Sequence, residues 1–199
     1  MKKAVFTISL FLVTTISFAQ DYKTNIKTEF SEYLHAIINK DFEKSMNYIV
    51  PEFFEFFPKS QMIKLMDQLF NDPEMEFVLK EAEIKTIHDA QKIEDKYYAF
   101  LTYSNQMNIK FLLDDEGEEQ TADEKKMYNN IMMLSFEKTF GEGNVNYDEE
   151  TEFYEIYVEK DVYAVSVNGK TDWKFLVIEK GQKPLLSKIL PKELADTLE

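Results

Sequence analysis

The sequence predicts an α+β fold in which N-terminal helices pack on the concave face of a curved antiparallel sheet. A further helix, at about residues 122–140, is expected between strands. Two observations lead to this prediction. Apolar residues at helical spacing fill the first third of the chain, whereas alternating apolar and polar residues fill most of the rest. Runs of helices followed by runs of strands are typical of α+β folds rather than doubly wound sheets.

The first 19 residues have the parts of a secretory signal peptide. Lys2 and Lys3 form a short positive region, and an apolar run follows from Ala4 to Ile16. Ser17-Phe18-Ala19 then places small residues at the two positions that a signal peptidase reads. The apolar run is too short to cross a bilayer comfortably, so an uncleaved membrane anchor is the less favoured alternative. We expect cleavage after residue 19, one α+β domain over residues 20–199, and an exported protein that is periplasmic or secreted.

Three helices are expected before residue 71. Asp41 can N-cap the second helix because its carboxylate can accept hydrogen bonds from the first turn, and that helix must stop before Pro51. The third is predicted over Lys59 to Phe70, closed by Asn71-Asp72-Pro73. The apolar face of the first helix comprises Ile26, Phe30, Tyr33, Leu34, Ile37 and Ile38.

Strands and one long helix are expected in the remainder. Met75 to Ile87 alternates as a strand with a bulge, and Tyr97 to Leu113 forms a long extended stretch. Thr121-Ala122-Asp123-Glu124 matches a capping box that opens the helix of about Ala122 to Phe140, which ends near Gly141. Three later strands are predicted over Glu152–Glu159, Val162–Val167 and Trp173–Ile178, with an Asn168-Gly169 hairpin turn before the last and short helical turns over Pro184 to Leu198.

Composition excludes several classes of chemistry. The chain has 199 residues with 37 acidic and 23 basic residues, a formal charge of −14, and no cysteine. Every basic residue is Lys. Disulfides, thiolate catalysis and Cys-ligated metals are therefore impossible. No nucleic-acid partner is expected, since neutralising phosphates requires a basic face.

The titratable residues do not form a recognisable catalytic or metal-binding motif. His35 lies at the edge of a helical apolar stripe, and His88 and Asp89 are neighbours whose side chains would point to opposite faces of a strand. The acidic runs Asp114–Glu119 and Asp148–Glu150 lack the spacing of a calcium loop. We therefore predict no catalytic residue, no metal site and no cofactor.

Several features resemble the nuclear-transport-factor-2-like superfamily, which includes ketosteroid isomerase and polyketide cyclases. They are a long first helix, the Lys40-Asp41-Phe42 junction, Tyr48-Ile49-Val50-Pro51-Glu52, a Trp173-Lys174-Phe175 strand, and Ile189-Leu190-Pro191 before a final helix. The resemblance covers about 180 residues and implies a cone-shaped α+β fold with a pocket between the helices and the concave sheet face. The expected helix at 122–140 departs from the simplest family layout. No motif of the isomerases can be placed here, so no catalytic residue carries over.

Aromatic residues supply the candidate ligand-binding site. Tyr combines apolar area with a hydroxyl, which suits a pocket or an interface, although cross-strand core pairs use the same residues. If a pocket exists where the resemblance implies one, Tyr48, Tyr103, Tyr163 and Trp173 are the candidate lining residues.

Three functions remain open from the sequence. The favoured one is a non-enzymatic module that binds a small apolar ligand or a protein partner. The second is a small isomerase, dehydratase or hydrolase that uses Asp, His or Tyr. The third is a dimerisation or interaction module that presents the sheet face. In each case we expect a monomer or homodimer that does not insert in a membrane after signal cleavage.

Overall fold

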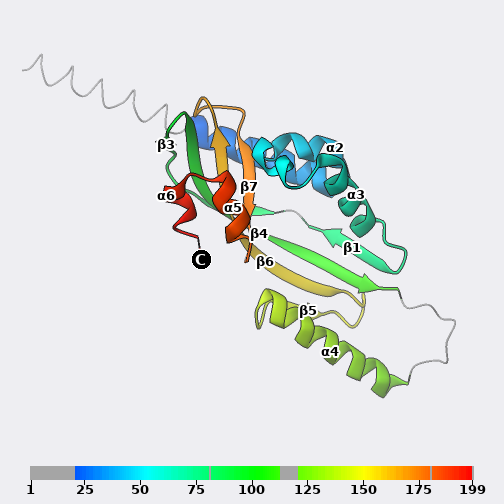
Figure 1. The fold of residues 1–199 in the computed structure, drawn as a ribbon. Coiled ribbons are helices and arrows are strands. Elements are labelled where there is room, and N and C mark those ends of the chain that lie inside the picture. The colour runs from blue at the N-terminus through cyan, green and yellow to red at the C-terminus, as the bar shows by residue number, and fades with distance from the viewer. Residues whose placement is uncertain (1–20, 81, 113–120, 180, 199) are drawn as a thin grey trace, which may run out of the picture.

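A computed structural model describes residues 21–198 except 81, 113–120 and 180. The predicted signal peptide and the acidic run Asp114–Glu119 lie outside the described residues. The described part is an α+β structure with N-terminal helices, a seven-stranded antiparallel sheet and a helix inserted between strands, as predicted (Figure 1).

Two long strands form the centre of the sheet. β4 (Lys96–Phe111) pairs with β6 (Tyr154–Ser166) in one unbroken antiparallel register, from Tyr97 opposite Ser166 to Ile109 opposite Tyr154. Short strands flank this pair. On the outer side of β4 lie β3 (Gln91–Ile93), β2 (Glu83–Ile87) and β1 (Met75–Leu79), and on the outer side of β6 lie β7 (Lys174–Ile178) and β5 (Val145–Tyr147).

The strand boundaries correct the sequence prediction in two places. The stretch Met75 to Ile87 is two strands, β1 and β2, with the expected bulge inside β2 between Ile84 and Thr86. The predicted strands Glu152–Glu159 and Val162–Val167 are one strand, β6. Lys160 and Asp161 between them continue the strand, because they pair with Tyr103 and Thr102 of β4 in the same register. The Thr102 hydroxyl also donates to the Asp161 carboxylate over 2.7 Å. The short strands β3 and β5 were not predicted.

The N-terminal helices begin with residues 21–38. Asp41 N-caps α2 (Phe42–Ser45) as predicted, its carboxylate accepting from the amide of Lys44 over 3.2 Å. The second helix is shorter than expected and continues as the 3₁₀ segments η1 (Met46–Tyr48) and η2 (Pro51–Glu55). The reason is the extended backbone between them, where the Val50 amide donates to Phe175 of β7 over 3.3 Å. α3 (Lys59–Phe70) has the predicted bounds.

Each face of one half of the sheet carries a separate apolar core. Helix 21–38 covers the face that presents Ala99, Leu101 and Tyr103 of β4, with Phe30 fully buried against them. The opposite face is covered by the C-terminal helices α5 (Lys183–Ile189) and α6 (Lys192–Ala195). The residues on that second face include Tyr98, Tyr163, Val165 and Leu176.

The inserted helix α4 (Ala122–Phe140) lies against the other end of the sheet, next to β5 and β6 (Figure 1). Its bounds and its capping box are as predicted: Thr121 accepts from the Glu124 amide, and Glu124 accepts from the Thr121 amide. The hydroxyl of Tyr154 donates to Asn129 over 2.8 Å and ties the helix to β6. None of the 19 residues of α4 is fully buried, but Met133, Phe136 and Phe140 pack on a third apolar cluster of the sheet. Within the described residues, no helix has both the length and the apolarity to span a bilayer.

Candidate functional site

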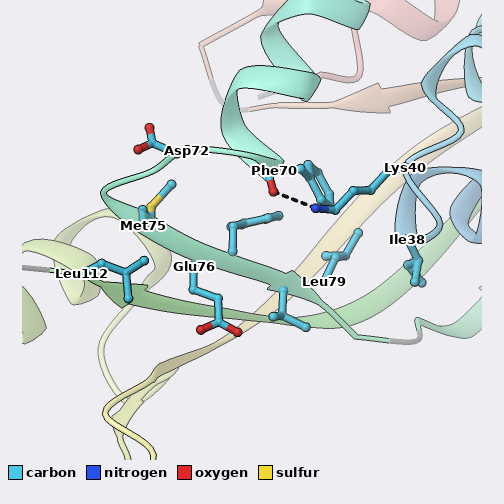
Figure 2. Close-up of a pocket in the computed structure, with 10 residues that line it drawn as sticks. Ile38, Lys40, Phe70, Asp72, Met75, Glu76, Leu79 and Leu112 are labelled. Carbon is cyan, nitrogen blue, oxygen red and sulfur yellow. Dashed lines mark hydrogen bonds between the residues drawn. The ribbon is translucent and has the colours of Figure 1, made fainter.

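A cavity of about 500 Å³ lies where helix 21–38, α3 and strand β1 meet. Figure 2 shows the strand below, with Phe70 and Lys40 above it. The lining residues are mostly apolar: Ile38, Lys40, Phe70, Asp72, Met75, Glu76, Phe77, Val78, Leu79 and Leu112. We call this cavity the edge groove.

The edge groove follows the outer edge of β1 rather than one face of the sheet. Side chains alternate along a strand, so Met75, Phe77 and Leu79 point to one face while Glu76 and Val78 point to the other. All five of these residues line the cavity. Figure 2 shows Glu76 projecting away from the side that carries α3. A cavity that touches both sets of side chains must run along the edge between them.

The backbone of β1 presents unpaired hydrogen-bonding groups to this groove. The amide of Leu112 donates to Glu74 over 2.8 Å, and the amide of Lys80 donates to Gln106 over 2.9 Å. Because antiparallel pairing alternates, Glu76 and Val78 also turn their backbone groups towards β4. The N–H and C=O groups of Phe77 and the N–H of Leu79 therefore point outward. Among the described residues none forms a hydrogen bond with them.

β7, on the other side of the sheet, differs from β1 in this respect. β7 has its outer edge covered by the segment before η2, through the Val50 amide on Phe175 and a parallel bridge between Ile49 and Phe175. β1 has no such neighbour in the described part of the chain. A strand edge of this kind is a template for pairing with another extended chain.

Lys40 holds the upper wall of the groove in place. Its backbone lies in the left-handed region, with φ of 59°, at the turn after helix 21–38. Its ammonium group donates to the carbonyl of Phe70 over 2.9 Å and to the side-chain oxygen of Asn71 over 2.8 Å. A cation at the C-terminal end of α3 satisfies an unpaired helix carbonyl and complements the helix dipole.

The inner wall of the groove is an aromatic stack. Phe70 is 9% exposed and packs edge-on against Phe77 of β1, with 4.8 Å between ring centroids. The ring of Phe42 supports Phe70 from behind at 5.3 Å. Aromatic pairs at these distances attract one another, and they form the apolar wall of the groove.

The rim of the groove is negatively charged. Asp72 and Glu76 line it, Glu74 lies between them, and all three side chains are exposed. The one basic lining residue, Lys40, already donates to two oxygen atoms of α3 and the residue after it. The edge groove therefore combines an apolar wall, outward backbone groups and an acidic rim.

The four ligand-binding candidates from the sequence do not line this groove or a smaller cavity of about 190 Å³ beside β5. Tyr103 and Trp173 belong to the core beneath helix 21–38, and Tyr48 packs at its border. Tyr163 belongs to the core on the opposite face, where its hydroxyl lies 3.4 Å from that of Thr197. Three of the four are thus on one side of the sheet, and the fourth is on the other.

Three tyrosines that lie in the first helix, or in or next to the core beneath it, have raised pKa values. Burial raises the pKa of Tyr33 to about 12, and burial together with a hydrogen bond to Glu32 raises the pKa of Tyr48 to about 12. Burial also raises the pKa of Tyr103. These phenols stay protonated at neutral pH, so they are hydrogen-bond donors there and not bases.

The carboxylate of Glu29, near the same core, accepts hydrogen bonds from two backbone amides. Burial raises the pKa of Glu29, against the opposing effect of backbone hydrogen bonds. Its two oxygens accept from the amides of Asp172, over 3.1 Å, and Trp173, over 2.6 Å. Glu29 thus fastens the loop before β7 to the first helix.

In the described part of the chain, the two histidines and the acidic residues singled out from the sequence do not form a common cluster. His35 is exposed, and the His88 ring packs against Phe100 with 5.6 Å between centroids. Asp89 pairs with Lys23 over 2.7 Å instead of with His88. The Asp148 carboxylate accepts from the amides of Glu150 and Thr151 within its own turn. Within the described residues no group of three His, Asp or Glu side chains is arranged to hold a metal ion.

No family model, curated protein or solved structure matches the chain. The site is therefore interpreted from its own geometry. Sequence reasoning had placed Ile38, Phe70, Met75, Phe77 and Leu79 on the apolar sides of their own elements, but had not brought them together. Lys40 was named only as part of the Lys40-Asp41-Phe42 junction, and its contact with the end of α3 was not predicted.

Proposed function

We propose that this protein is a non-enzymatic binding module whose ligand site is the edge groove. The observation that supports the proposal is the cavity along β1, with its aromatic wall of Phe70 and Phe77. Concave sites of a few hundred Å³ with mainly apolar linings and a few polar groups are typical of ligand sites. The ligand is a small apolar molecule or an apolar part of a protein partner.

The architecture supports a place in the nuclear-transport-factor-2-like superfamily as part of this proposal. Helices come first and a bent run of antiparallel strands follows, with helix 21–38 laid across the sheet. The inserted helix α4 remains a departure from the simplest layout. Because this fold hosts both enzymes and binding modules, the fold does not select the function.

The proposal includes export from the cytosol, because residues 1–19 have the parts of a secretory signal peptide. We propose that the protein works in the periplasm or outside the cell. Deleting residues 1–19 should retain the protein in the cytosol, whereas unchanged export of the deletion variant would contradict this part of the proposal.

The enzymatic alternative is a small isomerase, dehydratase or hydrolase. It requires an acid and a base that converge on one cavity. The raised carboxyl pKa of Glu29 is accompanied by two backbone hydrogen bonds. Tyr33, Tyr48 and Tyr103 lie in or at the border of the core beneath the first helix and do not line the edge groove. The groove geometry favours binding over catalysis.

Binding of the neutral apolar probe N-phenyl-1-naphthylamine, followed by fluorescence, tests the groove directly. Leu112→Asp introduces a charge at the groove rim, where Leu112 is 44% exposed. Leu65→Asp makes the same change at a 59% exposed position of α3 that does not line the groove. We expect the probe to bind the parent protein and Leu65→Asp equally, and Leu112→Asp at least tenfold more weakly. Equal binding to all three, at equal melting temperatures, would contradict the proposal.

A further inference from the structure

The edge groove offers more than an apolar surface. The outward N–H and C=O of Phe77 and the outward N–H of Leu79 need polar partners that repeat along the strand direction. Residues two apart in a strand are separated by about 6.8 Å. An extended peptide carries donors and acceptors at this same repeat, whereas a small apolar molecule does not.

The length of the free edge also fits a peptide. β1 has five residues, Met75–Leu79, and spans roughly 17 Å at 3.4 Å a residue. A peptide of about five residues would cover it. Its alternate side chains would meet the wall formed by Phe70 and Ile38 on one side of β1, and the acidic side chain of Glu76 on the other.

Charge selects the kind of peptide. Asp72, Glu74 and Glu76 are exposed along the edge, and the Lys40 ammonium is occupied by the end of α3. The whole chain adds a formal charge of −14, which attracts cations and repels acidic chains over longer distances. A basic peptide is therefore complementary to this rim, and an acidic one is not.

From these observations we infer that the ligand of the edge groove is a basic, extended peptide segment, which adds as a strand to the free edge of β1. This inference rests on the proposed function, since it names the ligand of the same groove. Backbone hydrogen bonds to Phe77 and Leu79 would supply affinity, while the apolar wall and acidic rim would supply selectivity.

A designed heptapeptide tests the inference. The probe is an end-capped Lys-Val-Lys-Val-Lys-Val-Lys chain with a fluorophore, measured by anisotropy against the full mature protein. Its controls are the same chain with N-methylated valines, which cannot donate their backbone hydrogens, and a chain with Glu in place of Lys. We expect the parent peptide to bind at least tenfold more tightly than either control, and to weaken as salt rises.

Two protein variants separate backbone pairing from side-chain contact. Leu79→Pro removes the outward N–H of residue 79 but leaves every hydrogen bond between β1 and β4 in place. Pro is tolerated at edge positions whose N–H faces away from the sheet. Leu79→Ala removes the side chain and keeps the N–H. We expect Leu79→Pro to bind the heptapeptide at least tenfold more weakly than Leu79→Ala, with both variants folded by circular dichroism.

The outcomes distinguish the inference from the proposed function. If the naphthylamine probe binds in the groove but the heptapeptide does not, or the N-methylated or acidic chain binds equally well, the inference fails and the proposed function stands. If neither ligand binds, both fail. A third outcome is that the protein dimerises as its concentration rises, that Leu79→Pro prevents the dimer, and that the peptide does not bind. The free edge of β1 would then pair with a second copy of the chain, and the inference would be overturned.

Discussion

The ammonium group of Lys40 lies 2.9 Å from the carbonyl oxygen of Phe70, and this contact joins the end of helix 21–38 to the end of α3. The two residues are 30 positions apart in sequence, yet together they form the upper wall of the edge groove. The groove therefore depends on how two helix ends are held, and not on a local motif.

Replacing Lys40 by Met should loosen this wall. The change removes hydrogen bonds to Phe70 and Asn71 while keeping a long apolar stem, and should lower the free energy of unfolding by about 1 kcal/mol. Urea denaturation measures this loss. Lys44→Met, at an exposed position of α2, removes the same charge from outside the groove and should have little effect. Equal losses in the two variants would show that the Lys40 contacts contribute nothing.

Thr121→Ala should destabilise α4 locally. The substitution removes half of the capping box with Glu124, at a cost of about 1 kcal/mol. The side chains that hold α4 on the sheet, Met133, Phe136 and Phe140, lie in its C-terminal half, so they do not compensate for a lost cap at its first turn. Hydrogen exchange should therefore accelerate in α4 and leave the amides of β4 and β6 unchanged. Acceleration throughout the sheet would mean that α4 and the sheet unfold as one unit.

Glu52 and Lys96 should make stability depend on pH. Burial opposes ionisation of Glu52, but hydrogen bonding and attraction to the Lys96 ammonium outweigh it, so the pKa of Glu52 is lowered. A lowered folded-state pKa stabilises the fold above the unfolded value of about 4.3, and this contribution is lost as the pH falls through the folded value.

The comparison of the parent protein with Glu52→Gln isolates this pair. Both partners are partly exposed, so the expected difference in unfolding free energy at pH 7 is at most about 1 kcal/mol. The difference should shrink steadily as the pH is lowered below about 4. A difference that stays constant between pH 7 and pH 3 would contradict the assignment of the pKa shift to this pair.

Chelation should leave the protein unchanged. Within the described residues no side-chain cluster is arranged to hold a metal ion, and Asp148 is used in its own turn. We expect the same melting temperature with and without EDTA. A clear decrease with EDTA, reversed by added Ca²⁺, would point to a metal at acidic residues and revive the calcium interpretation of the Asp114–Glu119 run.

Elements whose ends are set by neighbouring residues were predicted correctly, whereas an element set by pairing with a distant strand was not. The α3 and α4 boundaries followed from local signals, namely the Asn71-Asp72-Pro73 stop and the Thr121–Glu124 capping box, and both were confirmed. The sequence prediction left Lys160 and Asp161 between two strands, whereas both belong to β6 and pair with β4. Only the partner strand shows that Thr102 satisfies Asp161 across the sheet.

The candidate site was beyond sequence reasoning for a related reason. Phe77 and Leu79 have the alternation of any half-buried strand, and nothing local reveals that β1 is paired on one side and free on the other. The tyrosines were candidates because Tyr combines apolar area with a hydroxyl, but Tyr103 and Tyr163 lie in cores on opposite faces of the sheet. Whether they contact a ligand stays a prediction.

Amide hydrogen exchange along β1, resolved by residue with NMR, tests whether the outer edge of this strand is free. The free edge predicts that the amides of Phe77 and Leu79 exchange at least tenfold faster than those of Glu76 and Val78, which face β4. Adding the basic heptapeptide should slow Phe77 and Leu79 selectively. Equal protection of all four amides in the free protein would show that the edge of β1 is already covered and cannot accept a further strand.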